Sequence, residues 1–423
     1  MKIAPLLLLA GLLTPTLAAE WPEFRGPTAD GLVQTEGLPT EWAEGKNIAW
    51  KTALPGLGWS TPAIADGIAW LTSASLDGTT QTVHAIDIKT GDIVWEQLLV
   101  TTDNPEPLAN NMNTYATPSP VVADGRVYVH FGSYGTFCLD AKSRAILWQR
   151  RDLTNSHWRG PGSSPALWKD KLILTFDGAD QQYLVALDTA TGRTVWRRDR
   201  STAYGDEDPK TGRPANSGDM RKGYSTPVFV PIDGVTHLVS NSAKACWAYD
   251  PDTGEELWHV NYPTHSPSSR PVFSQELGLI FINTGLGKAE IWAIRADAKA
   301  RGDIGGTHVA WKLLKRTPKR SSPVLVGHLL FMANDGIAAC ADARTGELLW
   351  QERAGGEYSA SLLSDGKHVW FFDEVGLCTV VKATATYEKV AENSLDAGCL
   401  ASPAVADGAL FVRTRTHLYR IGQ

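Results

Sequence analysis

Cysteine is scarce in this chain and nowhere clustered. The 423 residues include five cysteines, Cys138, Cys246, Cys340, Cys378 and Cys399, with no adjacent pair and no CxxC spacing. A scaffold held together by disulfides would carry an even and denser set. We therefore expect small, buried cysteines, and one long-range disulfide stays open as an alternative.

The chain also lacks an excess of positive charge. Lys and Arg number 40 against 46 Asp and Glu, which gives a net charge of −6. Binding of nucleic acid by bulk charge needs a basic surplus, so nucleic acid is excluded as a partner class. The ten histidines form no HxH or HExxH pattern, and we predict no metal site.

Beyond the N-terminus there is no apolar run long enough to span a membrane. Residues 1–19 place Lys2 before a short apolar stretch that ends in small residues, a pattern typical of a secretory signal peptide. No cysteine follows that stretch, so no lipid anchor is predicted. We expect an exported, soluble, monomeric protein of the periplasm or the extracellular space.

What the chain does contain is an internal repeat. The pattern Asp-x-x-Thr-Gly-x-x-x-Trp occurs at 87–95, 188–196, 250–258 and 342–350, with a degenerate copy at 140–148. The predicted repeat residues, all structural, are Trp50, Asp87, Gly91, Trp95, Asp140, Trp148, Asp188, Gly192, Trp196, Asp250, Gly254, Trp258, Trp311, Asp342, Gly346 and Trp350. We expect the tryptophans to pack between repeat units.

A second pattern precedes the first, and it occurs eight times. It consists of Ser/Thr-Pro, an apolar run, often Asp-Gly, and another apolar run. Pro suits a strand start, Asp-Gly suits a hairpin, and the Asp-x-x-Thr-Gly turn joins two further strands. Each unit therefore predicts four antiparallel strands, and radial packing of such sheets gives an all-β fold, an eight-bladed β-propeller.

The two ends of the chain predict how the ring closes. The eighth copy begins at Ala401 and no fourth strand follows it, whereas NIAWKTAL at 47–54 looks like a fourth strand without a blade. We expect this N-terminal strand to complete the last blade, since closure removes a free sheet edge. The predicted organisation is a signal peptide at 1–19, an arm at 20–45 pinned to the propeller by Trp21, Phe24 and Arg25, and the propeller at 46–423.

With these motifs in hand, the chain resembles the pyrroloquinoline-quinone-like (PQQ-like) propeller repeat over nearly all of its length. WPEFRGP at 21–27 and the closing segment 401–422 are similar to a secreted bacterial subfamily of that group. Two related families imply different functions. Quinoprotein alcohol dehydrogenases bind the quinone with calcium, and the BamB-like outer-membrane assembly lipoprotein is a scaffold without a cofactor.

The chain departs from both families. The dehydrogenases share an adjacent cysteine pair beside the quinone and inner-strand carboxylates for catalysis and calcium, and neither pattern is present. We therefore predict no catalytic residues, no cofactor, and neither PQQ nor calcium. The lipid-anchor cysteine of the BamB-like proteins is also missing.

Candidate binding residues come from the loops that enter the first strands, because those loops ring the channel mouth of a propeller. In each of the eight copies we take the residue three positions before the Pro. The seventh copy has no Pro, and Ser361 is aligned in its place. The resulting ring includes Trp59, Tyr224, Arg320 and Tyr358. Tyr115 and Arg159 lie in neighbouring loops. The row of Ser and Thr beside each Pro either faces channel water or caps the strand entries.

These aromatic and guanidinium groups suit a sugar, a carboxylate or an extended peptide; packing of the aromatics inside the channel is the open alternative. The sequence predicts a non-catalytic binding or scaffold module that uses the loop face and channel mouth. Its partner would be an envelope or extracellular protein or a polysaccharide. A PQQ- and calcium-dependent or sugar-oxidising oxidoreductase is the alternative from the enzyme class.

Overall fold

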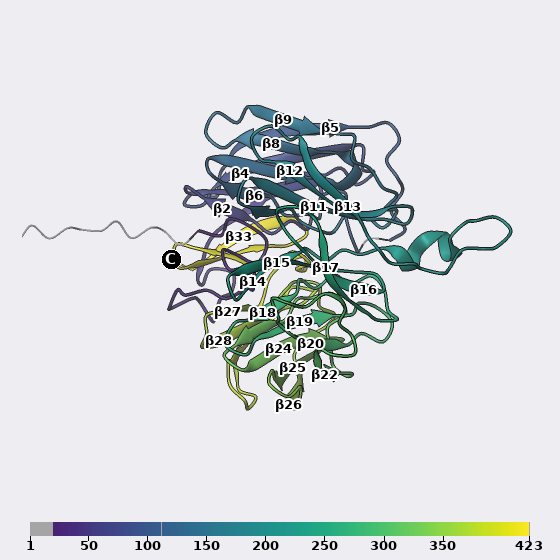
Figure 1. The fold of residues 1–423 in the computed structure, drawn as a ribbon. Helices are drawn as coiled ribbons and strands as arrows, with labels where there is room; N and C mark the ends of the chain where they lie inside the picture. The colour runs from purple at the N-terminus through teal and green to yellow at the C-terminus, as the bar shows by residue number, and fades with distance from the viewer. Residues whose placement is uncertain (1–19, 111, 423) are drawn as a thin grey trace, which may run out of the picture.

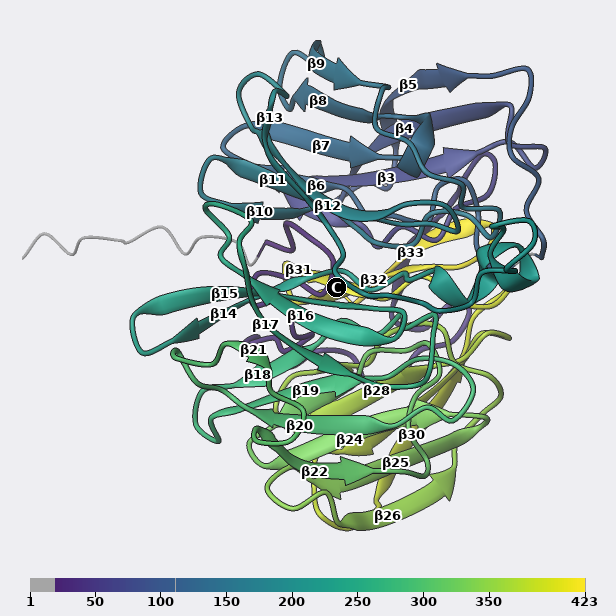
Figure 2. The same ribbon diagram turned by 45° about the vertical axis from the view of Figure 1, so that its right-hand side comes forward.

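The computed structural model describes residues 20–110 and 112–422, so the predicted signal peptide lies outside the described residues. Eight sheets stand around a common axis, and the prediction of an eight-bladed all-β propeller is confirmed. Figures 1 and 2 show the blades following one another around the ring in chain order. None of the helices in the described part has the length and apolarity to cross a bilayer.

The first four blades run from the inner to the outer strand in chain order. Blade 1 contains β2 (Ala63–Ala65), β3 (Ile68–Ala74), β4 (Thr80–Asp87) and β5 (Ile93–Thr101). Blade 2 contains β6 (Val121–Ala123), β7 (Arg126–His130), β8 (Thr136–Asp140) and β9 (Ile146–Arg150), with the 3-10 turn η1 (Gly132–Tyr134) between β7 and β8. Blade 3 contains β10 (Ala166–Trp168), β11 (Lys171–Asp177), β12 (Gln182–Asp188) and β13 (Thr194–Asp199). Blade 4 contains β14 (Val228–Ile232), β15 (Val235–Ser242), β16 (Ala245–Tyr249) and β17 (Glu256–Asn261), and η2 (Ala215–Arg221) lies before it.

The remaining blades repeat this order, except that the last is completed from the N-terminus. Blade 5 contains β18 (Val272–Ser274), β19 (Leu279–Asn283), β20 (Ile291–Arg295) and β22 (Val309–Leu313). Blade 6 contains β23 (Val324–Val326), β24 (Leu329–Asn334), β25 (Ile337–Asp342) and β26 (Leu348–Arg353). Blade 7 contains β27 (Leu363–Ser364), β28 (His368–Phe372), β29 (Leu377–Lys382) and β30 (Lys389–Ser394). Blade 8 contains β31 (Ala404–Ala406), β32 (Ala409–Arg413), β33 (His417–Ile421) and β1 (Ile48–Ala53).

Ring closure follows the sequence prediction. β1 pairs antiparallel with β33, from Ile48 opposite Ile421 to Ala53 opposite His417. Figure 2 places the yellow C-terminal strands between the purple first blades and the green later blades. The sheet that would otherwise end at β33 therefore has a paired outer strand.

Blade 4 gains a fifth strand that the sequence did not predict. The polar segment between β20 and β22, in the fifth repeat, supplies β21 (Gly302–Asp303), which pairs parallel with β17. Trp258 lies opposite Gly302 in this pairing. Blade 5 lacks the Asp-x-x-Thr-Gly turn. The inserted strand β21 instead covers the outer edge of blade 4 by pairing with β17.

Elsewhere, the repeat tryptophans contact the turns of the neighbouring blade. The indole Nε1 of Trp50, Trp148 and Trp311 donates to a carbonyl just after the turn aspartate of the next blade, at 2.9–3.1 Å. The turn glycine lies against the ring, at positive φ: 70° for Gly192, whose added Cβ would be 2.7 Å from Trp148. A side chain at this position would collide with the tryptophan and strain the backbone.

The arm crosses one end of the channel. Trp21 is buried and forms a two-way backbone bridge with Ile64 of β2, at 2.9 and 2.7 Å. Arg25 is 1% exposed and donates to the carbonyls of Ser322, Pro323 and Asp30. The arm thus joins blades 1 and 6, which lie on different sides of the ring.

Burial lowers the pKa of Arg25 to about 9, since its guanidinium donates to carbonyls and to no carboxylate of the described residues. Arg270, also buried, donates 2.6 Å to the carbonyl of Phe24 and lies 3.6 Å from Glu23. These two arginines fix residues 23–25 beneath the channel.

The tryptophan–glycine contact predicts a stability difference between two similar glycines. Gly192 and Gly125 both have φ near +70°, but no atom lies within 4 Å of a Cβ added at Gly125. We expect Gly125→Ala to lower the free energy of unfolding by about 1–2 kcal/mol through backbone strain. Gly192→Ala adds overpacking of Trp148, a further ~1–3 kcal/mol. Urea denaturation of both variants measures the difference, and equal losses would contradict the docking role of Trp148.

The buried arginine predicts a selective release of the arm. Arg25→Ala leaves three carbonyls without their donor, and we expect a loss of about 2–3 kcal/mol in the free energy of unfolding. Limited proteolysis should then cut within residues 20–45 before the propeller. Arg213→Ala, at an exposed arginine in the segment before blade 4, is the control and should behave as the wild type. An arm as resistant in Arg25→Ala as in the wild type would rule this anchor out.

Candidate functional site

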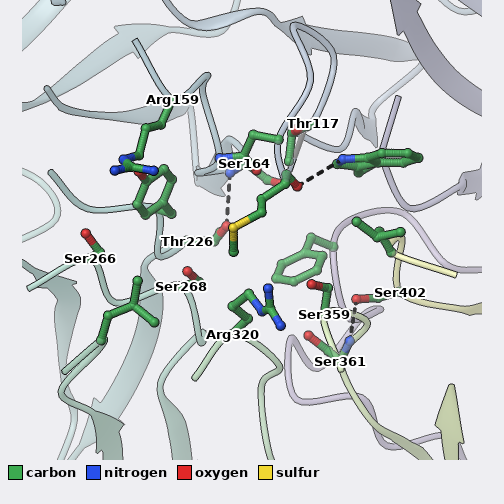
Figure 3. A pocket seen from close by; sticks show the side chains of 18 of the residues that line it. Thr117, Arg159, Ser164, Thr226, Ser266, Ser268, Arg320, Ser359, Ser361 and Ser402 are labelled. Carbon is green, nitrogen blue, oxygen red and sulfur yellow. Dashed lines mark hydrogen bonds between the residues drawn. The ribbon is translucent and has the colours of Figure 1, made fainter. Parts of the chain in front are cut away.

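The site is a cavity of about 350 Å³ on the propeller axis, called the central cavity below. Phe24 of the arm is among its lining residues. The residues four positions before the start of each inner strand form its rim, and all eight line it: Trp59, Thr117, Gly162, Tyr224, Ser268, Arg320, Ser359 and Leu400. Figure 3 shows Thr117, Ser268, Arg320 and Ser359 converging from different blades.

The rim corrects one sequence prediction. In the seventh repeat, Ser361 makes the hydrogen bonds between blades that the Ser or Thr before Pro makes in other repeats. Ser361 therefore corresponds to that Ser or Thr and not to the Pro, so the rim residue of this repeat is Ser359. Tyr358 is therefore one residue out of register. Its side chain is 2% exposed, packs edge-on against Phe371, and its hydroxyl donates 2.6 Å to the Ala354 carbonyl. The seventh repeat lacks the Pro that marks the register elsewhere, so the sequence alignment slipped by one.

The structure separates the other predicted binding residues into two groups. Trp59, Arg159, Tyr224 and Arg320 line the central cavity. Tyr115 does not; it lines a neighbouring pocket, and its hydroxyl donates 3.0 Å to the Glu106 carbonyl. Ligand binding by any of these residues stays a prediction.

A row of hydroxyls, which we call the hydroxyl belt, joins the blades inside the cavity. Each hydroxyl oxygen accepts the backbone N–H of the aligned residue in the preceding blade, at 2.9–3.2 Å. The belt consists of Ser119, Ser164, Thr226, Ser322, Ser361 and Ser402. Figure 3 shows two of these bonds, to Thr226 and to Ser402. The Ser and Thr before Pro therefore link neighbouring blades by hydrogen bonds.

Four belt hydroxyls keep a proton available to the cavity. Ser361 donates to Ser322, and Ser322, which does not line the cavity, has no acceptor for its own proton; the hydroxyls of Ser119, Ser164, Thr226 and Ser402 likewise have no acceptor among the described residues. All four line the cavity. A ligand that presents acceptor oxygens would find donors on several sides.

The charged groups at the mouth are paired. Arg159 donates to both carboxylate oxygens of Asp219, at 2.8 and 2.9 Å, and Lys222 Nζ lies 2.8 Å from the same carboxylate. Burial raises the pKa of Asp219, but its bonds from Arg159 and Lys222 outweigh this and hold the pKa at about 2. Burial lowers the pKa of Lys222 to about 8.

Across the mouth, Arg320 lies 2.8 Å from Glu357 and 3.2 Å from Glu374. Glu374 also accepts the hydroxyl of the rim residue Ser359, at 2.5 Å. At the mouth, Arg159, Lys222 and Arg320 are thus each paired with a carboxylate.

Two functional features were missed by sequence reasoning. Phe24 was predicted only as an anchor of the arm, and its place at the cavity lining depends on the long-range bond from Arg270. Met112 lines the cavity, and its carbonyl accepts the Trp59 indole N–H at 3.1 Å. No local pattern marks either position, because both follow from how distant segments meet.

Comparison with solved structures supports the fold. BamB from Moraxella catarrhalis covers 88% of this chain, and 99% of its own length is matched, with a TM-score of 0.59 and 13% identity. A quinohemoprotein alcohol dehydrogenase from Comamonas testosteroni covers 96% of this chain and 81% of its own, with a TM-score of 0.61 and 16% identity. At these identities the likeness shows the propeller alone.

Curated relatives match over shorter stretches. A 1-butanol dehydrogenase (quinone) from Thauera butanivorans is 27% identical over 261 residues, which are 54% of this chain and 38% of the relative. A quinoprotein ethanol dehydrogenase from Pseudomonas aeruginosa is 28% identical over 220 residues, 48% of this chain and 33% of the relative. The chain thus spans little more than a third of the length of these relatives.

A family model settles the membership that the repeat suggested. The model described as outer membrane protein assembly factor BamB matches residues 33–258 and 135–373, well over half of the sequence. The chain belongs to this PQQ-like, BamB-type propeller family.

Proposed function

We propose that this protein is an exported, non-catalytic binding module that takes the end of a carbohydrate chain into its central cavity. The observation that carries the proposal is the set of four belt hydroxyls without acceptors, which lie below the aromatic rim residues Trp59 and Tyr224. Sugar rings offer hydroxyls to such donors and apolar faces to aromatic side chains. A cavity of about 350 Å³ is within the range of small-molecule sites, roughly 300–1,000 Å³.

The ion pairs at the mouth favour a neutral ligand. Arg159, Lys222 and Arg320 each have a carboxylate partner at 2.8–2.9 Å. An incoming anion would have to compete with those carboxylates, and an incoming cation with those basic groups. A neutral oligosaccharide disturbs neither set.

The quinone chemistry of the dehydrogenase relatives does not fit these residues. Among the described residues, Asp219 is the one carboxylate side chain that lines the central cavity, and it is bound by Arg159 and Lys222. Within the described ranges no group of three or more His, Cys, Asp and Glu side chains could hold a metal ion. The five cysteines are buried and far apart in sequence, and none lines the cavity. We derive no reaction through a quinone.

A second candidate function, docking of an envelope protein on the loop face, is favoured by one structural feature. Residues 199–223 project from the propeller on the right of Figure 1. Their tip is ordered by a copy of the repeat turn, in which Asp208 accepts the N–H groups of Lys210 and Thr211 at 2.8 and 2.9 Å. Arg221 anchors the base through Asp206 at 2.5 Å. A rigid projection beside the mouth suits a partner surface.

The carbohydrate proposal predicts which aromatic residues matter. We expect cellotetraose, maltotetraose or chitotetraose to bind the mature protein, and Trp59→Ala and Tyr224→Ala to weaken binding at least tenfold, about 1.4 kcal/mol. Tyr358→Phe, which alters a tyrosine outside the cavity, is the matched control and should bind as the wild type. Isothermal titration calorimetry measures the affinities, with a thermal melt of each variant to establish folding.

The same experiment includes PQQ with Ca²⁺ as a competing probe. A ligand at 100 times its dissociation constant stabilises the fold by about 2.7 kcal/mol, which a thermal melt detects. Stabilisation by PQQ with Ca²⁺ and by none of the sugars would reject the carbohydrate proposal and favour the dehydrogenase relatives.

The docking candidate predicts that the projection is needed for partner capture and dispensable for the fold. Replacing residues 208–213 by a short Gly-Ser linker should leave the melting temperature within about 2 °C of the wild type, because this segment is exposed and the Arg221–Asp206 pair is kept. Cross-linking in the envelope, followed by mass spectrometry, should lose the wild-type partner in this variant. Retention of the same cross-linked partner would exclude the projection as its docking surface.

A further inference from the structure

A second cavity of about 400 Å³ lies between blades 2 and 3, and we call it the side pocket. Its walls come from the loop after β5, from the end of β7 with η1, from the loop between β9 and β10, and from the end of β11. Gly162 is the one residue that lines both this pocket and the central cavity. Neither the family relationship nor the proposed function assigns a role to it.

Polar atoms without partners converge on the side pocket. The Thr175 hydroxyl and the His157 Nδ1 are buried and have no hydrogen-bond partner among the described residues. Thr175 as a whole is 8% exposed. Leaving such a group unpaired costs roughly 1–3 kcal/mol, so a molecule that supplies the missing partners would be stabilising.

Two histidines present neutral nitrogen atoms there. His157 Nε2 lies 3.4 Å from the Gly223 carbonyl, so the ring donates through Nε2 and Nδ1 is left as an acceptor. His130 is 2% exposed, and its Nδ1 lies 2.8 Å from the Thr136 hydroxyl. Burial lowers the pKa of His157 to about 4 and that of His130 to about 3. Both rings are therefore uncharged at neutral pH.

The charged groups of the pocket exclude an anion. Asp177 is fully buried and paired with Arg200, whose Nε and Nη2 lie 2.9 and 2.7 Å from its oxygens. The carboxylate of Glu106 accepts hydrogen bonds from the Ser156 hydroxyl at 2.7 Å and from the backbone N–H of His157 at 2.8 Å. No Lys or Arg side chain lines the pocket in the described chain.

Donors and apolar faces complete the side pocket. The Asn155 amide nitrogen has no partner in the described chain, since only its carbonyl oxygen is bonded, to Ser133 at 3.0 Å. Phe176 lies against the edge of His130, with ring centroids 5.4 Å apart. The pocket thus offers neutral acceptors, hydroxyl and amide donors, and an aromatic face.

From this combination we infer that the side pocket is a second binding site, for a neutral polyhydroxylated molecule about the size of a monosaccharide. A hydroxyl group donates and accepts at once, so one ligand hydroxyl satisfies an imidazole nitrogen while another accepts from Thr175 or Asn155. The inference is independent of the proposed function, because the residues that carry it lie outside the central cavity.

The test uses the mature protein with myo-inositol, D-glucose and trehalose as probes, and gluconate as an anionic comparison. Thr175→Val removes the unpaired hydroxyl without changing the side-chain shape. Thr72→Val is the matched control, since Thr72 holds the equivalent place on β3 of blade 1, where its hydroxyl lies 3.4 Å from the Ala116 carbonyl. Trp59→Ala reports on the central cavity, because Trp59 lines that cavity, whereas Tyr224 packs against His157 of the side pocket. Calorimetry gives the affinities, and long-range ¹H–¹⁵N spectra follow the His157 Nδ1.

We expect one or more neutral probes to bind, to shift the His157 Nδ1 resonance, and to lose at least fivefold in affinity in Thr175→Val but not in Thr72→Val or Trp59→Ala. If Thr175→Val does not fold, His157→Phe replaces it, since the phenyl ring keeps the packing against Tyr224. Three results would overturn the inference: no binding by any neutral probe at 100 mM, which means water alone fills the pocket; preference for gluconate; or loss of binding in Trp59→Ala with none in Thr175→Val.

Discussion

The contact between the outer-strand tryptophans and the next blade's Asp-x-x-Thr-Gly turn sets the spacing of the propeller. The indole ring lies on a glycine whose positive φ and missing side chain leave room for it, as with Trp148 on Gly192. The ring N–H then binds a carbonyl beyond the turn aspartate, 2.9 Å away in this pair. Because the contact recurs, neighbouring sheets are held at a similar distance, and the inner strands meet in register near the axis.

That inner register creates the hydroxyl belt, and the belt in turn shapes the central cavity. A serine or threonine before Pro uses its oxygen to accept a backbone N–H from the preceding blade, which leaves its proton free for a ligand. Blade 5 breaks the belt with Arg270, and this guanidinium reaches the arm instead, at the Phe24 carbonyl. Arg270, which stands where the other repeats have Ser or Thr, thus holds in place the arm segment that contains the cavity-lining Phe24.

Departures from the repeat are where the structure adds to the sequence. The seventh repeat has no Pro, and its inner strand has two residues. Its rim residue is Ser359, one position after the predicted Tyr358. The fifth repeat has an insertion in place of the Asp-x-x-Thr-Gly turn, and part of this insertion forms a fifth strand of blade 4. In both repeats the local pattern was too degenerate to fix the register, and contacts with adjacent blades decided it.

The all-β class and the eight blades could be predicted from the sequence, because strand pairing within a blade depends on residues close together in the chain. The closing strand pairs across the length of the chain, and it was predictable because the eighth repeat lacks a fourth strand whereas residues 47–54 have no blade of their own. The cavity-lining residues Trp59, Tyr224 and Arg320 followed from their rim positions in the repeat, and Arg159 from a neighbouring loop. Only the tertiary structure decided that Tyr358 is buried in packing, that Phe24 lines the central cavity, and that Thr175 and His157 share a pocket. Those features join side chains from separate segments and blades, and no local spacing encodes the distances between them.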